Sequence, residues 1–224
     1  SDQDDIWLEN KIENAIQNIL IKATLKEKFS SKIPILYGGR TTYYDENCKS
    51  ELGNSLLFKK KPSFRNAIIQ NIAGGNTMVF NNPAKKIIIK SINRSSEIIS
   101  HDWWCYQIIS GVNGIVYYDK LSFVKYRQHS KNLLGANNSI KDRFSRIKSL
   151  LIAKLKISNN VNLETLYKNK ALLTKENQMV LNKLRECRNQ SILKRILSFQ
   201  STGIYRQTFF GNLALFFAIV TKRI

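Results

Sequence analysis

The sequence predicts an α/β domain followed by a basic α-helical extension, and three observations carry this prediction. Up to residue 137, strand-like and helix-like patterns alternate, which is typical of α/β folds. Beyond that point the pattern is one helix after another. Basic residues gather in the same region: residues 141–224 hold 17 Lys and Arg against 4 Asp and Glu, and the preceding 140 residues hold 19 against 12. We therefore predict a domain over 1–137 and a helical extension over 138–224.

Each predicted element has a local signal. Helices are marked by apolar residues at helical spacing, by the Asn82-Pro83 cap and by Asp102, and strands by β-branched and aromatic residues beside Gly turns. The expected helices of the α/β part cover 9–29, 64–71, a segment from 82, and 102 to 111 or 114. The expected strands cover 33–39, ending at a Gly-Gly turn, and then 76–81, 115–119 and 122–129. The helices of the extension are expected over 140–156, 174–187 and 191–199.

Composition excludes several classes of protein. The three cysteines lie far apart with no CxxC spacing, which argues against a disulfide framework or a structural zinc site and favours a reducing compartment. The first residues are acidic and therefore do not form a signal peptide, which needs a basic start and an apolar stretch. The formal net charge of +20 suits an anionic partner, whether nucleic acid, a membrane surface or a phosphorylated molecule.

The C-terminal stretch 203–224 has two open interpretations. Residues 209–220 are mostly apolar, but these 12 residues are shorter than the roughly 20 that a membrane-spanning helix needs. Arg206 precedes them and Lys222-Arg223 follows, as expected for a helix lying in a membrane interface between cationic flanks. The alternative is a C-terminal helix that packs on the domain.

The acidic cluster at the start is the first candidate site. Asp2 and Asp4 offer hard oxygen ligands that suit Mg²⁺ or Mn²⁺, and Asp5 stands beside them. The structural alternative is a solvated turn in which Asp5 caps the helix that follows. A DxD tripeptide is a weak signal when it stands alone.

Three further stretches carry polar and aromatic residues. In "HDWW", from His101, the carboxylate of Asp102 is a candidate general base, or else a helix cap before core tryptophans. In "YRQH", Arg127 and His129 share one face of a strand and suit a pyrophosphate. In "GGNTMVFN", Gly74-Gly75 permits close approach of a ligand, or simply forms a tight connection.

Taken together and in this order, "SDQDDIW", "GGNTMVFN", "HDWW" and "YRQH" resemble the inverting family 2 glycosyltransferases, and most closely their bacterial rhamnosyltransferase-like group. The resemblance covers residues 1–135. It implies a GT-A fold, which is Rossmann-like with a mixed sheet. It also implies that the fold is incomplete here, because a nucleotide-binding half would precede the DxD motif, so that the chain alone would bind donor weakly and not turn over.

The resemblance also implies residue roles. Asp2 and Asp4 match the carboxylates that hold the metal, and Asp102 matches the catalytic base. The expected donor-diphosphate contacts are Asp5, Arg127 and His129. The expected acceptor and sugar contacts are Gly74, Gly75, Asn76, Thr77, His101, Trp103 and Trp104.

The implied reaction moves a sugar from a nucleotide diphosphate to a saccharide or lipid-linked acceptor with inversion, and without any specific nucleic acid. Rhamnose from a dTDP donor is the expected sugar, and UDP-hexoses are the alternative. The expected place is the cytoplasm, at the inner face of the cell membrane. The rival hypothesis is a non-catalytic basic protein that binds membranes or nucleic acid, because the helical extension supplies phosphate-contacting charge.

Overall fold

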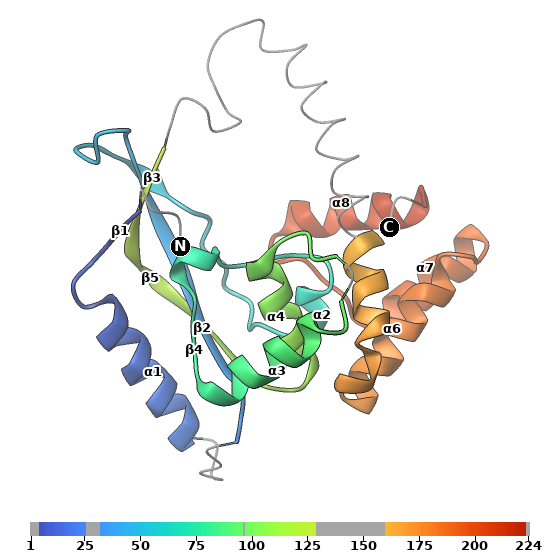
Figure 1. Cartoon of the computed structure of the whole chain (residues 1–224). Helices are drawn as coiled ribbons and strands as arrows, with labels where there is room; N and C mark the ends of the chain where they lie inside the picture. The colour runs from blue at the N-terminus through green and yellow to red at the C-terminus, as the bar shows by residue number, and fades with distance from the viewer. Residues whose placement is uncertain (1–4, 26–31, 96, 129–159, 223–224) are drawn as a thin grey trace, which may run out of the picture.

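The computed structural model describes residues 5–25, 32–95, 97–128 and 160–222. In this part of the chain a mixed sheet carries helices on both faces and is followed by further helices (Figure 1). The predicted α/β class with a mixed sheet and a helical continuation is therefore confirmed. The helix expected over 140–156 lies outside the described residues.

The sheet contains five strands in the described residues, in the order β1-β5-β2-β3, with β4 also pairing with β2. Strands β2 and β5 are parallel, and the other pairings are antiparallel. A parallel pair needs a crossover, which here runs through the helices between the two strands. The strands are β1 (Ile6–Trp7), β2 (Ile35–Tyr44), β3 (Glu51–Asn54), β4 (Val79–Phe80) and β5 (Ile115–Arg127).

Two layers of helices cover the central strands. On one face of the sheet, Leu36, Val116 and Tyr118 pack among residues of the helices over 82–92 and 101–111. On the other face, Tyr37 contacts the helix over 11–25. Figure 1 shows α1 on one side of the sheet and α3 and α4 on the other. These helices are α1 (Lys11–Leu25), α2 (Phe64–Ala67), α3 (Asn82–Ile92) and α4 (His101–Gly111).

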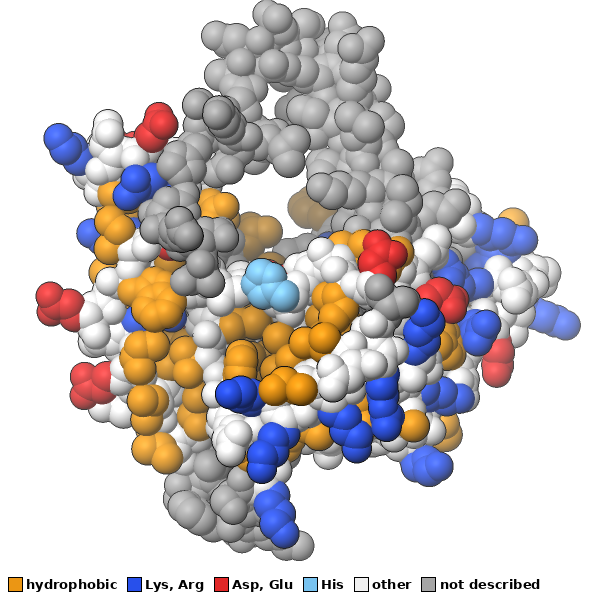
Figure 2. Space-filling view, viewed as in Figure 1, with side chains coloured by type: hydrophobic (Ala, Val, Ile, Leu, Met, Phe, Trp, Pro, Cys, Tyr) orange, Lys and Arg blue, Asp and Glu red, His pale blue; other side chains and the backbone are white. Residues whose placement is uncertain are grey.

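A buried polar cluster ties α1 to the sheet. The carboxylate of Asp119 accepts hydrogen bonds from the Tyr37 hydroxyl at 2.8 Å and from the Asn14 amide at 2.9 Å. Burial and this carboxylate raise the pKa of Tyr37 far above its ordinary value. The outer side of α1 is apolar, with Ile12 and Ile16 exposed, and Figure 2 shows apolar side chains gathered over this helix.

Two strand predictions are wrong in their bounds. Strand β2 does not turn at Gly38-Gly39 but continues to Tyr44. The glycines serve close packing, since a β-carbon at Gly38 would lie 2.8 Å from that of Ala73. The two strands expected over 115–119 and 122–129 form the single strand β5, whose pairing with β2 shifts register beside Asp119. The break in the strand pattern of the sequence at Asp119 therefore marks irregular pairing within one strand and not a turn between two strands.

The predicted helix starts hold within one residue for α3 and α4 and within two residues for α1. The cap of α3 is Asn81, whose side chain accepts from the Ala84 N–H, so the Asn-Pro signal is displaced by one position. Helix α4 runs from His101 to Gly111, as the sequence predicts. The segment predicted as strand 76–81 instead contains a short 3₁₀ turn, η1 (Gly75–Thr77), and β4.

The helices after residue 160 share a core with the α/β part. They comprise residues 160–168, a 3₁₀ turn η2 (Lys170–Leu172), α6 (Lys175–Cys187), α7 (Ile192–Thr202) and α8 (Phe209–Val220). One buried cluster joins side chains on both sides of the predicted boundary, and we call it the shared core. Its buried members are Phe64, Ile68, Ile69, Trp104, Ile108, Leu163, Leu166, Leu173, Val180, Leu181, Leu184, Cys187, Ile204, Leu215 and Ile219. The boundary at 137, as a division between two domains, stays a prediction.

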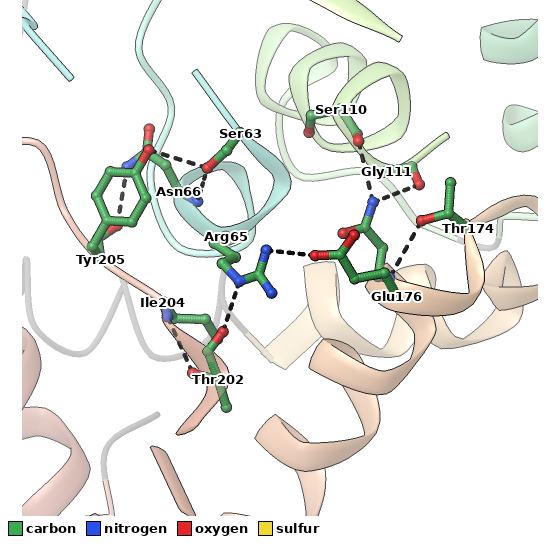
Figure 3. Close-up of polar contacts among 11 residues, drawn as sticks. Ser63, Arg65, Asn66, Ser110, Gly111, Thr174, Glu176, Thr202, Ile204 and Tyr205 are labelled. Atoms are coloured by element: carbon green, nitrogen blue, oxygen red, sulfur yellow. Dashed lines mark hydrogen bonds and ion pairs between the residues drawn. The ribbon is translucent and has the colours of Figure 1, made fainter. Parts of the chain in front are cut away.

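Polar contacts frame this junction (Figure 3). Arg65 pairs with Glu176 at 2.9 Å and donates to the Thr202 carbonyl at 3.0 Å. The Asn177 amide donates to the Gly111 carbonyl at the end of α4, at 2.9 Å. Both partners of the ion pair are solvated, so the pair itself contributes little stability and the apolar burial beside it dominates.

Candidate active site

The start of α4 and the Gly74–Thr77 turn lie against each other. A β-carbon at Gly75 would collide with Nε2 of His101, so only glycine lets the imidazole reach this backbone. Thr77 fixes the turn, because its hydroxyl donates to the Gly74 carbonyl at 2.7 Å and accepts from the Gly39 N–H at 3.2 Å. The two stretches singled out in the sequence, 26 residues apart from Gly75 to His101, are therefore brought together.

The acidic segment is tied to the same turn. The Asn76 amide donates to Oδ2 of Asp5 at 2.7 Å, across 71 positions of sequence. Asp5 directly precedes Ile6, which pairs with Lys125 of β5, and Arg127 ends that strand two residues later. Asp5 and Arg127 thus lie toward one edge of the sheet. The side chains of Asp2, Asp4 and His129 lie outside the described residues.

Asp102 lies in the first turn of α4, where the helix dipole and free N–H groups favour a carboxylate. Its Oδ1 accepts from the Trp103 N–H at 2.7 Å and from the Ser100 hydroxyl. Both hydrogen bonds recorded for Asp102 in the described part of the chain use Oδ1.

The two tryptophans of "HDWW" are core residues. The indole N–H of Trp103 donates to the Ala67 carbonyl at 2.6 Å, and that of Trp104 donates to the Ser91 hydroxyl at 2.9 Å. Trp103 is 8% exposed and Trp104 only 1%. The expectation that they line the sugar site does not fit this burial, because their ring faces are covered by protein. Their core packing instead fixes the position of α4, and with it Asp102.

Arg127 is held at the end of β5, where the Gln128 N–H donates to the Tyr44 carbonyl at 2.9 Å. Its Nε is buried and has no hydrogen-bond partner in the described part of the chain. A buried guanidinium N–H without an acceptor is costly, so a ligand or a further segment that supplies an acceptor oxygen would be favoured here. An anionic oxygen, such as that of a phosphate, is a suitable partner.

A cavity of about 710 Å³ opens beside this constellation. Aromatic and amide side chains that sequence reasoning missed contribute to its wall, together with Gly74 and Asn76 of the turn. Tyr126 could have been found from its place directly before Arg127, but Tyr43 and Asn71 carry no local signal. The wall includes Tyr43, Phe58, Asn71, Gly74, Asn76, Tyr126 and Gln128. Rings combined with amides suit a saccharide, which presents both apolar faces and hydroxyls.

A larger cavity of about 850 Å³ lies at the other end of α4, lined by Ser110, Asn113 and Gly114 among others. It is remote from the Asp102 carboxylate, because α4 spans 11 residues at ~1.5 Å each. The smaller cavity is lined by Gly74 and Asn76 of the turn that contacts His101 and Asp5, and by Tyr126 and Gln128, the two neighbours of Arg127.

Cys105 provides a reporter of the Asp102 charge. Burial, and secondly the Asp102 carboxylate, raise the pKa of the Cys105 thiol to about 11. Since the thiolate is the reactive form, alkylation of Cys105 at pH 8 should be tens-fold slower than that of a free cysteine peptide, whose pKa is about 8.5. The rate should rise steadily up to about pH 11, as followed by peptide-resolved mass spectrometry with iodoacetamide.

The variant Asp102→Asn sharpens this prediction. Loss of the carboxylate charge should lower the Cys105 pKa and raise its alkylation rate at pH 8, although burial persists. Asp45→Asn is the matched control, because Asp45 lies in the exposed turn between β2 and β3. Equal Cys105 rates in all three proteins would show that the Asp102 charge does not reach this thiol.

Comparison with known proteins gives one informative relationship. The chain is 31% identical over 148 residues to the dTDP-rhamnosyl transferase RfbG of Shigella flexneri. The aligned residues make up 66% of this chain and 48% of the relative. No family model and no solved structure matches the chain. The chain thus spans about half the length of the curated relative it matches. Similarity of this extent supports a relationship to the glycosyltransferases.

Proposed function

We propose that this chain is the catalytic and acceptor-side part of an inverting family 2 glycosyltransferase of the GT-A type that transfers rhamnose from a dTDP donor. One observation carries the proposal: the Gly74–Thr77 turn, part of which lines the smaller cavity, contacts both Asp5 and His101, the neighbour of Asp102, although these residues are far apart in sequence. The similarity to a dTDP-rhamnosyl transferase agrees with it.

In the proposed reaction, Oδ2 of Asp102 accepts the proton of an acceptor hydroxyl. The hydroxyl oxygen forms a bond to the anomeric carbon as the bond to the donor diphosphate breaks, and the nucleoside diphosphate leaves with the electron pair. One displacement inverts the anomeric centre. General-base catalysis of this kind contributes about 10²–10⁴-fold to a rate. The Ser100 hydroxyl and the Trp103 N–H hold Oδ1 and so orient the base.

We assign the departing diphosphate to Arg127, His129 and Asp5, and the acceptor to His101 and the Gly74–Thr77 turn. Asp2 and Asp4 would hold Mg²⁺ or Mn²⁺, for which carboxylates are the fitting ligands. When bound, such an ion supplies positive charge that stabilises the diphosphate as it leaves. The Asn76 contact to Asp5 ties the acidic segment to the acceptor turn and so fits this assignment.

The proposed acceptor is a saccharide, either in a polysaccharide or linked to a lipid at the inner face of the cell membrane. About half of the Shigella relative lies outside the matched region. We propose that an equivalent segment supplies the contacts to the base and ribose. UDP-hexoses are the alternative donors, and base recognition within that segment would decide between them.

The direct test is a transfer assay with the full-length protein, a nucleotide-sugar panel and a saccharide acceptor. Transfer from dTDP-rhamnose is expected in Mn²⁺ or Mg²⁺. Removal of the ion with EDTA should lower the rate by about 100-fold or more, since charge stabilisation of the leaving group is lost. Re-addition of Mn²⁺ is the control and should restore the rate. Full activity in EDTA would exclude the metal role of Asp2 and Asp4, and no turnover of any donor would favour a non-catalytic binding protein.

A further inference from the structure

Helix α8 carries an exposed aromatic and aliphatic face. Phe209 and Phe210 are 77% and 79% exposed, and Phe217 is 57% exposed. At ~100° per residue the exposed residues fall within an arc of about 120° of the helix surface. We call this surface the α8 face, and it consists of Phe209, Phe210, Leu213, Phe216 and Phe217. Contiguous exposed apolar surface of this kind marks an interaction site.

The orientation of the α8 face is fixed by the rest of the fold. Leu215 and Ile219, on the other side of the helix, are buried in the shared core. The Arg195 guanidinium of α7 holds the end of α8, because Nη1 donates to the carbonyls of Ile219 at 3.2 Å and Val220 at 3.1 Å. The Thr208 hydroxyl caps its start by accepting from the Gly211 N–H at 3.0 Å. The face therefore points outward because both ends and the inner side of α8 are anchored.

A cationic pocket of about 560 Å³ adjoins the end of α8. The N-terminus of α7, the exposed Lys222 and the buried Arg195 line it. The Ser191 side chain makes no capping hydrogen bond to the first turn of α7, which leaves the first-turn N–H groups to solvent or to a ligand. Arg195 is 2% exposed, and its Nη1 and Nη2 donate to the carbonyls of Ile219, Val220 and Gln190. Its Nε has no hydrogen-bond partner, and no carboxylate pairs with the guanidinium, among the described residues. Helix N-terminus and cations together favour an anionic oxygen group such as a phosphate.

An apolar face beside a phosphate-favouring pocket matches the two parts of a phospholipid. The face suits the acyl boundary of a bilayer, and the pocket suits the headgroup phosphate. Among the residues that the structure describes, every helix is too short or too polar to cross a bilayer. Helix α8 has 12 residues and a helix lying in the interface needs no greater length. The net charge of +20 complements an anionic leaflet.

We propose that the α8 face and the pocket at Lys222 form the docking surface for an anionic phospholipid membrane. The inference rests on the membrane location proposed above, and it names the residues that make the contact. It does not depend on Asp102 or on the sugar donor. Lipid binding and sugar transfer can therefore fail independently.

The test is co-sedimentation of the full-length protein with vesicles of phosphatidylglycerol and phosphatidylcholine, compared with pure phosphatidylcholine. The double variant Phe210→Ser, Phe217→Ser should lower the partition coefficient on mixed vesicles at least 10-fold, since it removes two exposed rings from the α8 face. Lys222→Glu should lower binding to mixed vesicles and reduce the preference for the anionic lipid. Because these side chains are exposed, the variants should retain the wild-type far-UV circular dichroism.

The matched control is Leu121→Ser, Met179→Ser, which removes two exposed apolar side chains elsewhere, 64% and 57% exposed. Its vesicle binding should equal that of the wild type. Unchanged binding of the α8 variants, or an equal loss in the control, would overturn the proposal. The proposal would also be overturned if the wild type sediments as a dimer and the α8 variants sediment as monomers. The α8 face would then bind a second copy of the chain. Transfer to a soluble acceptor, measured in parallel, reports separately on the catalytic proposal.

Discussion

Replacing Asp102 by Asn in the full-length protein should lower kcat by about 10²–10⁴-fold, because the amide cannot accept the proton of the acceptor hydroxyl. The fold should persist, since the Asn side-chain oxygen can still accept from the Trp103 N–H and the Ser100 hydroxyl, as Oδ1 of Asp102 does. The measurement is initial-rate transfer from dTDP-rhamnose, with kcat and KM determined separately. KM for the donor should change little, because Asp102 is assigned to the acceptor.

The matched control for this loss is Asp45→Asn, which removes a carboxylate charge from an exposed turn. That variant should retain the wild-type kcat. If Asp102→Asn keeps more than a tenth of the activity while folded, the general base is another group. If the variant loses its activity because it no longer unfolds in a cooperative thermal transition, the carboxylate serves to stabilise the first turn of α4, where Ser100 is the N-cap residue.

Replacing Leu181 by Ala in α6 should lower the free energy of unfolding by about 2–5 kcal/mol, because a fully buried side chain leaves a cavity in the shared core. Since this core also contains Trp104 of α4, the loss should weaken both parts of the chain together. For a chain of this length the melting temperature should fall by about 2–4 °C per kcal/mol. The emission of Trp103 and Trp104, both buried in α4, should change in the same transition as the helical circular dichroism.

Leu193→Ala is the control, because Leu193 is 77% exposed and its loss should change stability by about 0.5 kcal/mol at most. Two separate transitions, with helix lost before the tryptophan signal changes, would contradict the shared core. They would instead support the predicted boundary at residue 137 as a division between independently folding domains. A single transition would show that the extension stabilises the helix that carries Asp102.

Local signals were sufficient for the elements that depend on neighbouring residues. The periodicity over 9–29, the Asn-Pro start near Asn82 and the Asp102 turn predicted helices that the structure contains. Local signals failed where the cause lies elsewhere in the chain. Gly38-Gly39 resembled a turn, but Gly38 is small because Ala73 packs against it, and Gly39 lies close to Asp119 of the neighbouring strand. The two strand patterns around Asp119 form one strand because β2 pairs with both.

For the candidate site, too, some features follow from the local sequence and others only from tertiary packing. By itself, the sequence determined the α/β class and the basic helical continuation, since composition and short-range pattern encode them, and it predicted candidates for a general base and a diphosphate site. Only the tertiary structure decided that Asn76 reaches Asp5, that Gly75 admits His101, that both tryptophans are core residues, and that the α8 face remains exposed. The physical reason is that contact and burial depend on the packing of distant segments, which a local pattern does not record.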